Sequence, residues 1–225
     1  MIVNLIVQIV LWFGGIGVIL FGLAGTLRWM GAWVFLAELT SCGLVSGLLL
    51  AKHDPALLKE RLRLAPAEGQ PVQDKQLMVM LFATMLAWLI VMPLDAVRFG
   101  WSWVPVWLKV VGAIGLPLSM WITYRTFRAN SFAVPTVRIQ RERGHALITS
   151  GPYAYVRHPM YAGALIMFAS TSLLLGSWWA LALLPVFLAL FGVRTGLEER
   201  TLRTGLDGYD TYTARVRYRL IPGIW

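Results

Sequence analysis

The feature that most constrains this chain is a series of long apolar runs that occupies most of its 225 residues. Each run is about 20 residues long, which is the length that an α-helix needs to cross a hydrocarbon core of ~30 Å. Runs of this length exclude the shorter, alternating strands of a membrane β-barrel. Only 14% of the residues are charged and 58% are hydrophobic, whereas a soluble domain carries about 25% charged residues. We therefore predict an all-α, polytopic integral membrane protein.

The runs divide into six predicted spans. A tight turn at residues 28–30 joins the first two spans, and residues 176–177 join the last two, so each pair should form an antiparallel hairpin. The fifth span is the shortest, which predicts a tilted or partly buried helix. The six spans cover roughly residues 4–27, 31–51, 76–94, 103–124, 160–175 and 178–194.

Basic residues collect on one side of these spans. Of the 20 Lys and Arg residues, five follow the second span, six follow the fourth, and six lie at the end of the sixth and in the tail. With six crossings these segments share one side, which the positive-inside rule places in the cytoplasm together with both termini. Orientation and anionic membrane lipids account for the net charge of +9, and we expect no nucleic-acid partner.

The sequence lacks the usual motifs of soluble cofactor and metal enzymes. There is no P-loop, HExxH or CxxC, and with one cysteine and scattered histidines we expect no metal site. Gly14, Gly15 and Gly17 imitate part of a dinucleotide fingerprint, but no strand precedes them. Close helix packing is the better interpretation for these glycines, as it is for Gly43 and Gly47.

Two features of the first half remain open from the residues alone. The connection after the second span contains LLKERLRL, which predicts either a short interfacial amphipathic helix ended by Pro66 and Pro71 or a solvated linker. Glu38 falls near the middle of the second span, where an ionised carboxylate is costly. Structural pairing and a functional role are both consistent with Glu38.

A polar segment, HALITSGPYAYVRHPMYAG at residues 145–163, precedes and enters the fifth span. Because a residue before proline is pushed out of the helical region, His158 should be extended, with Pro159 in the first helical turn. The N–H groups of that turn suit a polar or anionic ligand group. A binding site and an interfacial anchor formed by Arg157 and the tyrosines are both consistent with the pattern.

A second polar segment, RTGLEERTLR, leaves the sixth span at residues 194–203. Arg194 and Glu198 are four residues apart and share a helix face, whereas Glu199 points about 100° away. The simplest interpretation is a helix-end salt bridge worth a few tenths of a kcal/mol. Alternatively, Glu198 accepts hydrogen bonds from hydroxyls or an amine while Arg194 binds a carboxylate.

Together the two segments form a recognisable pattern. The elements RHPxYxG and EExxL, the hairpin between them and the ending YTARVRYRLIPGIW resemble the isoprenylcysteine carboxyl methyltransferase family, which is grouped with membrane phospholipid methyltransferases. The resemblance covers roughly the last 100 residues. It implies two regions, an N-terminal transmembrane region at 1–124 and a C-terminal methyltransferase core at 125–225.

The resemblance implies an enzyme that uses S-adenosyl-L-methionine, bound at the cytoplasmic face between the two polar segments. Arg194 matches the arginine expected near a substrate carboxylate. The spacing from Phe132 leaves open whether Arg138 or Gln140 approaches the cofactor. The residues on the cofactor side would be His145, Ala146, Leu147, Ile148, Tyr153, His158, Pro159, Met160, Tyr161 and Glu198.

The acceptor is less well determined. The family resemblance implies a lipophilic acceptor, with an isoprenylcysteine-like carboxylate as the first candidate and phospholipid amines or small thiols as alternatives. A carboxylate needs no general base, whereas an amine or thiol would, and His158, Glu38 and Glu199 are the nearby candidates. A membrane reductase that uses NADPH is an alternative from another class. A transporter is disfavoured because the spans lack an evident repeat.

Overall fold

The computed structural model describes residues 1–63 and 70–225, and every regular element within those ranges is helical, as predicted. Five segments are long and apolar enough to cross a membrane, and a sixth apolar helix, α6, has 17 residues. The long segments are α1 (Ile2–Ala24), α2 (Met30–His53), α4 (Val72–Pro93) with the π-helical η1 (Leu94–Arg98), α5 (Val106–Ala129), and α7 (Trp178–Ala182) with α8 (Leu184–Gly205); α6 covers Pro159–Leu175.

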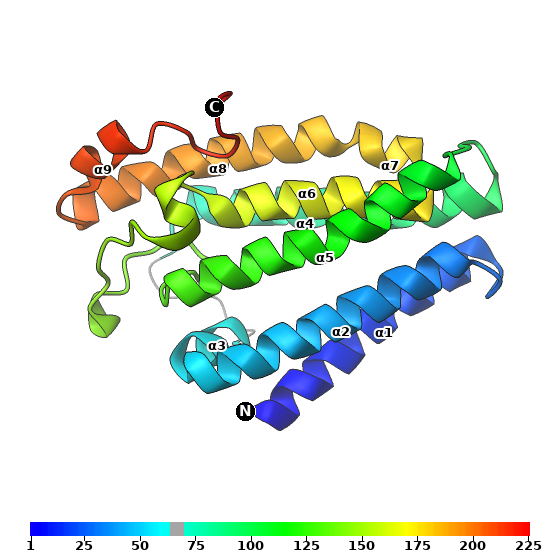
Figure 1. Cartoon of the computed structure of the whole chain (residues 1–225), viewed down its shortest axis with the longest axis horizontal. Helices are drawn as coiled ribbons and strands as arrows, with labels where there is room; N and C mark the ends of the chain where they lie inside the picture. Colours follow the sequence, from blue (N-terminus) through cyan, green and yellow to red (C-terminus); the bar gives the residue numbers. More distant parts are fainter. Residues whose placement is uncertain (64–69) are drawn as a thin grey trace.

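The short elements lie in the connections and the tail. They are α3 (Pro55–Arg61), the 3-10 turns η2 (Arg141–Arg143) and η3 (Gly151–Ala154), and α9 (Tyr209–Arg215). In Figure 1, α3, the connection from α5 to α6, and α9 lie at one end of the bundle, whereas the turns α1–α2, α4–α5 and α6–α7 lie at the other. The three basic segments therefore share one end, as the charge pattern predicted.

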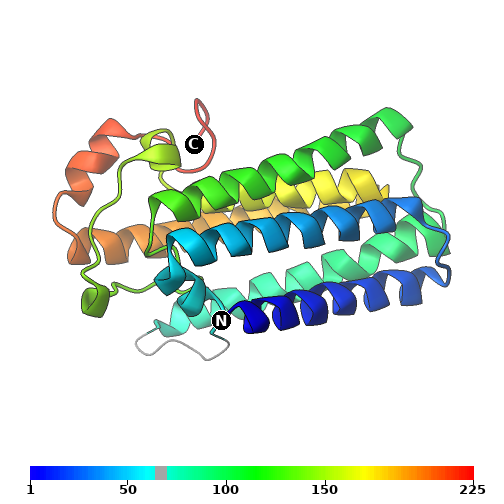
Figure 2. The same ribbon diagram turned by 60° about the horizontal axis from the view of Figure 1, so that its bottom comes forward.

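Both predicted hairpins are confirmed. Residues 25–29 join α1 to α2, and Gly25 has φ 71, a left-handed conformation that glycine adopts without steric cost. Gly176, with φ 85, ends α6 in the same way before α7 begins. Figure 2 shows α1 and α2 side by side along one face of the bundle.

The polar segment that follows the sixth predicted span is helical, as the shared helix face of Arg194 and Glu198 required. The helix α8 continues to Gly205, because the polar segment contains good helix formers and no proline. This extension carries Glu198 and Glu199 beyond the apolar part of the helix on a rigid support.

Helix α6 is the most enclosed of the apolar helices, as its short length predicted. More than half of its residues are buried, and Phe168 stacks on Phe187 of α8 with ring centroids 3.9 Å apart. Its approach to α5 depends on small residues: a Cβ atom added to Gly112 would lie 2.5 Å from the backbone oxygen of Ser170. Small residues that let helix backbones approach are the usual means of helix association in membranes.

The predicted packing role of the N-terminal glycines is confirmed for three of five. A Cβ added to Gly17, Gly43 or Gly47 would lie 2.7–3.2 Å from a side chain of the opposite helix of the α1–α2 hairpin. Gly14 and Gly15 have nothing within 4 Å and are exposed, so the packing prediction is wrong for them. They lie on the outward face of α1.

The connection after α2 forms the predicted short helix, with a different environment from the one expected. Asp54 caps α3 by accepting a hydrogen bond from Leu57 N at 2.9 Å. Leu57 and Leu58 are buried against other parts of the protein instead of facing lipid. The helix ends at Arg61; Pro66, the predicted end, lies outside the described residues.

Glu38 lies midway along α2, as predicted. It is half-buried, and its Oε2 atom is buried without a hydrogen-bond partner among residues 1–63 and 70–225. It does not line the pocket described below. The structure therefore provides no partner that would explain Glu38.

Candidate active site

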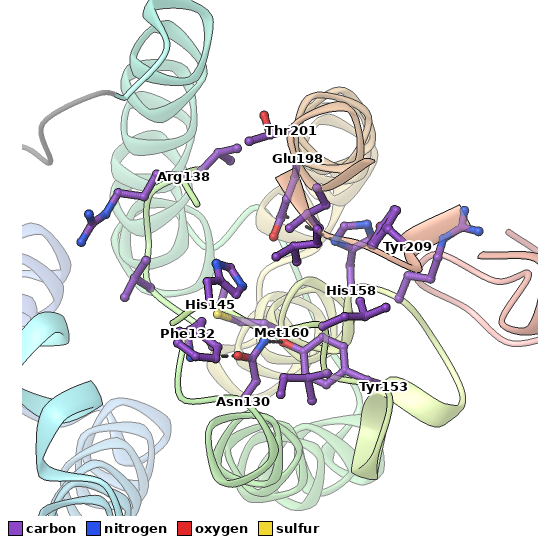
Figure 3. A pocket seen from close by; sticks show the side chains of 18 of the residues that line it. Asn130, Phe132, Arg138, His145, Tyr153, His158, Met160, Glu198, Thr201 and Tyr209 are labelled. Carbon is purple, nitrogen blue, oxygen red and sulfur yellow. Dashed lines mark hydrogen bonds and ion pairs between the residues drawn. The ribbon is translucent and has the colours of Figure 1, made fainter. Parts of the chain in front are cut away.

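A pocket lies at the end of the bundle that carries the basic segments. The connection from α5 to α6, the first turn of α6, the extension of α8, and α9 contribute its walls. Figure 3 shows Glu198 and His158 on one side, Phe132 and His145 on another, and Met160 between them. The pocket is lined by all ten residues that the family resemblance placed on the cofactor side: His145, Ala146, Leu147, Ile148, Tyr153, His158, Pro159, Met160, Tyr161 and Glu198.

His158 has the predicted position at the entrance to α6. Its backbone is non-helical, with φ −127 and ψ 64, and Pro159 begins the helix. The backbone N–H of His158 donates to the carbonyl oxygen of Arg219 at 2.9 Å. The tail of the chain thus supports the entrance to α6, a contact that the sequence did not indicate.

Glu198 directs its carboxylate into the pocket but does not form the predicted salt bridge with Arg194. The Tyr161 hydroxyl donates to Glu198 Oε2 at 2.8 Å, and His158 Nδ1 lies 3.5 Å from the same oxygen. Within the described ranges the hydrogen bonds to Glu198 reach only Oε2. Oε1 therefore remains available to accept hydrogen bonds from a ligand.

Glu199 forms the buried side of the same cluster. Its carboxylate lies 3.2 Å from His158 Nε2, 2.8 Å from Arg157 Nε and 3.1 Å from a terminal nitrogen of Arg219. Burial alone lowers the pKa of His158, but the hydrogen bonds and charges of Glu198 and Glu199 outweigh burial and raise it above 6.5. Both ring nitrogens of His158 thus face a carboxylate, and these contacts favour the protonated form of the ring.

Arg194 has a different partner, Asp74 at the start of α4. Arg194 Nε donates to Asp74 Oδ1 at 3.0 Å, and a terminal nitrogen donates to the carbonyl oxygen of Pro135. Both side chains are buried. Asp74 Oδ2 also accepts from Val137 N at 3.2 Å, so the pair joins α4, α8 and the pocket wall. Arg194 itself does not line the pocket, although its guanidinium lies 5.7 Å from the Tyr161 ring.

The opposite wall consists of two stacked rings. The centroids of Phe132 and His145 are 4.4 Å apart. His145 Nδ1 accepts from Gln140 N at 3.3 Å, so a neutral ring carries its proton on Nε2. Burial, reinforced by Arg143, lowers the pKa of His145 and favours this neutral form.

The structure distinguishes the two candidates upstream of His145. Arg138 lines the pocket, but its guanidinium points outward, 2.6 Å from Glu142 and 3.5 Å from Glu60 (Figure 3). Gln140 is fully buried behind the wall, where its amide donates to the Phe132 carbonyl oxygen at 2.8 Å. Gln140 therefore supports the stacked rings, whereas Arg138 contributes to the pocket rim.

Several lining residues were not among the predicted ones. Asn130 and Tyr212 are two of them, and both contact the predicted residue Tyr153. The Asn130 amide donates to the Tyr153 hydroxyl at 2.9 Å, and the Tyr212 hydroxyl donates to the Tyr153 carbonyl oxygen at 2.8 Å. Burial raises the pKa of Tyr212 to about 12, so its hydroxyl stays protonated. The tyrosines of α9 lie in the segment on which the family resemblance rests, so the resemblance could have indicated them as lining residues. Nothing in the sequence indicated Asp74.

The pocket combines groups of different chemical character. It offers a carboxylate with one unengaged oxygen, a neutral imidazole on an aromatic ring, protonated tyrosines and the apolar segment Ala146–Leu147–Ile148. This set suits a ligand that joins a cation, hydroxyl or amine groups and a flat heterocycle. Among the described residues no group of His, Cys, Asp and Glu side chains could hold a metal ion.

Comparisons with known proteins agree with the predicted resemblance. Residues 107–206 match a family model described as phospholipid methyltransferase. A curated relative, protein-S-isoprenylcysteine O-methyltransferase of Schizosaccharomyces pombe (strain 972 / ATCC 24843), is 38% identical over 82 residues, which are 36% of this chain and 35% of that protein. The match thus spans about a third of the relative's length.

A solved structure shares the fold. It is that of the eukaryotic intramembrane Ras methyltransferase ICMT (isoprenylcysteine carboxyl methyltransferase) without a monobody. The alignment covers 95% of this chain and 74% of that chain, with a TM-score of 0.56 and 18% identity. The predicted resemblance and the all-helical membrane fold are therefore both confirmed.

The raised pKa of His158 predicts how the stability of the protein depends on pH. Because the folded pKa is raised, the stabilisation is complete below pH 6.5 and is lost as pH rises through the raised pKa. We expect the melting temperature of the detergent-solubilised protein to fall over this range, and His158→Gln to remove that part of the slope. The exposed His53 supplies a control, because His53→Gln should leave the slope unchanged. An unaltered slope in His158→Gln would show that His158 is neutral in the folded protein.

Proposed function

We propose that this chain is an integral membrane methyltransferase that uses S-adenosyl-L-methionine to methylate a lipophilic acceptor, most specifically the carboxylate of an isoprenylcysteine-like substrate. The observation that carries the proposal is the Glu198 carboxylate, which faces a pocket with aromatic and apolar walls. This pocket is built largely from the region that matches the phospholipid methyltransferase model. The relative from Schizosaccharomyces pombe is a protein-S-isoprenylcysteine O-methyltransferase, which supports an oxygen acceptor such as a carboxylate.

The residues of the pocket fit the chemical parts of the cofactor. When bound, the cofactor supplies a methyl group on a positively charged sulfur atom. Glu198 Oε1 would accept hydrogen bonds from an amine or from hydroxyls of the ligand, and its negative charge would favour a cationic group nearby. The His145–Phe132 wall and the apolar segment 146–148 would hold a flat heterocycle.

The protein's main contribution to the reaction would be alignment. Methyl transfer is a displacement in which the nucleophile, the methyl carbon and the leaving sulfur must lie in line, so a large part of the barrier is removed by holding the reactants in place. A carboxylate nucleophile is already ionised at neutral pH and needs no base. This agrees with His158, whose two ring nitrogens both face carboxylates, Glu198 and Glu199, so that neither nitrogen is free to accept a proton from the acceptor.

Arg194 is our candidate for the acceptor carboxylate. Among the described residues, only two of its N–H groups have hydrogen-bond acceptors, Asp74 and Pro135. The guanidinium carbon lies 5.7 Å from the ring of Tyr161, which lines the pocket. Asp74 would keep the guanidinium oriented while an acceptor carboxylate binds the remaining donors. A lipophilic acceptor would reach this point from the bilayer, whereas the polar cofactor would enter from the aqueous side.

The sidedness of the site follows from the basic segments, which we propose lie in the cytoplasm together with both termini. The proposed methyltransferase core, residues 125–225, remains a prediction as a separate region. Packing crosses its boundary, since Leu20 and Trp88 belong to the same buried cluster as Phe168 and Phe187.

The family that matches residues 107–206 is described as phospholipid methyltransferase, which favours a second acceptor class, the amine of a phospholipid headgroup. An amine must lose a proton before or during transfer, and it would not need the guanidinium of Arg194. Methylation of a carboxylate acceptor should therefore depend on Arg194, whereas methylation of a phospholipid amine should not.

Substitution of Glu198 tests the cofactor site. Glu198→Gln keeps the size of the side chain but removes its charge, and we expect binding of S-adenosyl-L-methionine to weaken by about tenfold or more. Titration calorimetry on the detergent-solubilised protein measures this effect. Asp210→Asn removes an exposed carboxylate on α9 and should bind like the wild type. If wild-type protein binds no S-adenosyl-L-methionine at millimolar concentration, the proposed function is wrong.

Substitution of Arg194 tests the acceptor side. Arg194→Lys retains the charge beside Asp74 but removes the forked N–H donors, so we expect the KM for a prenylated cysteine acceptor to rise about tenfold while the cofactor Kd is unchanged. Arg200 lies exposed on the same helix, and Arg200→Lys should change neither value. An equal loss of cofactor and acceptor binding in Arg194→Lys would instead show that the Asp74–Arg194 pair only stabilises the fold.

A further inference from the structure

The last residues of the chain lie against the entrance to α6. The N–H groups of Arg157 and His158 donate to the carbonyl oxygens of Tyr218 and Arg219, at 3.0 and 2.9 Å. His158 is extended because Pro159 follows it, so its N–H needs an acceptor outside the helix. The tail supplies that acceptor and holds the backbone of His158 from behind the pocket.

The side chain of Arg219 reaches the same cluster. Its Nε lies 3.2 Å from Glu199 Oε1, and a terminal nitrogen lies 3.1 Å from Oε2. This is the two-point geometry by which a guanidinium binds a carboxylate most specifically. Glu199 is buried, with 4% of its side chain exposed, and its Oε1 lies 3.2 Å from His158 Nε2.

The tail has a fixed position of its own. Leu220 is 1% exposed and belongs to the main buried cluster of the bundle. The N–H groups of Leu220 and Ile221 donate to the carbonyl oxygen of Trp225, at 2.9 and 3.1 Å, which turns the chain end back on itself. The Trp225 ring lies against Gly192 of α8, and the Arg219 guanidinium lies 5.3 Å from that ring. Figure 1 shows the C-terminus returning over α8.

We propose that Arg219 is a positioning residue of the cofactor site, which acts through Glu199 and His158 on Glu198. Arg219 holds Glu199, Glu199 holds one nitrogen of His158, and the other nitrogen of His158 faces Glu198 Oε2. The charged and titratable groups that face His158 are Glu198 and Glu199 from α8, Tyr161 from α6, and through Glu199 the guanidinium groups of Arg157 and Arg219. Arg219 itself does not line the pocket.

The inference rests on the proposed function, because its effect is on the binding of S-adenosyl-L-methionine. The contacts of His158 add to the hydrogen bond from the Tyr161 hydroxyl in holding the Glu198 carboxylate at the pocket wall. A side chain with several rotatable bonds gains binding precision when its partners are themselves fixed. In this chain the outermost residue in the series of contacts that ends at Glu198 is Arg219, and the segment 219–225 holds Arg219 in place.

Three variants test the proposal. We expect Arg219→Ala to weaken S-adenosyl-L-methionine binding about tenfold, and Arg219→Lys to recover part of the loss because it keeps the charge. Arg217 is exposed two residues earlier, and Arg217→Ala should bind like the wild type. Titration calorimetry gives the Kd values, and the turnover number at saturating cofactor should change less than the KM for the cofactor. Wild-type affinity in Arg219→Ala would overturn the proposal.

A double-mutant cycle separates positioning from general loss of stability. If Arg219 acts through Glu199, then Arg219→Ala should add little to the loss already caused by Glu199→Gln. If the two losses multiply, Arg219 acts by another route and the proposed chain of contacts is wrong. Failure of the proposed function has a different signature, because then the wild-type protein would bind no S-adenosyl-L-methionine at all.

Discussion

The placement of one imidazole between two carboxylates is the interaction on which the rest of the site depends. His158 faces Glu198 through one ring nitrogen and Glu199 through the other. Removing one partner from a buried ion pair typically costs about 3–5 kcal/mol, because the remaining charge loses its solvation and its partner together. The entrance of α6, the extension of α8 and the tail are therefore tied to one another by the same few charges. The cluster leaves one oxygen, Glu198 Oε1, facing the pocket.

The helices can bring these groups together because α6 lies so close to its neighbours. Gly112 and Gly115 of α5 leave no room for a Cβ atom against Ser170, and the aromatic stack of Phe168 and Phe187 fills the other side of α6. At the pocket end, the buried Asp74–Arg194 pair joins α4 and α8 to the loop that carries Phe132. Apolar packing within the bundle thus determines where the polar ends of the helices meet, and the polar contacts determine their orientation.

Much of the fold and of the pocket lining was predictable from local patterns. The apolar runs predicted the helices, and the proline after His158 predicted its extended backbone, because both depend on neighbouring residues only. Glu198 and the segment 145–148 were placed at the pocket by a family pattern. The partners of these residues were not predictable in this way. Asp74 lies 120 residues from Arg194, and a helical spacing of four residues favoured Glu198 instead.

The same limit applies to the end of α8 at Gly205. Hydropathy reports where the apolar stripe ends, and helix propensity together with distant polar partners decides where the helix ends. Residues 194–205 are polar on the surface that meets Asp74, His158 and Arg219, so their helix is stabilised by contacts from three separate parts of the chain. The role of Arg219 is of the same kind, since its partners are 20 and more residues away.

The most direct test of the central claim is to locate bound S-adenosyl-L-methionine on the protein. Ultraviolet irradiation of the solubilised protein with the radiolabelled cofactor, followed by digestion and peptide mapping, reports which residues lie next to it. We expect label within residues 145–161 or 198–212, reduced by excess unlabelled cofactor. Competable label confined to other peptides, or no competable label at all, would contradict the central claim.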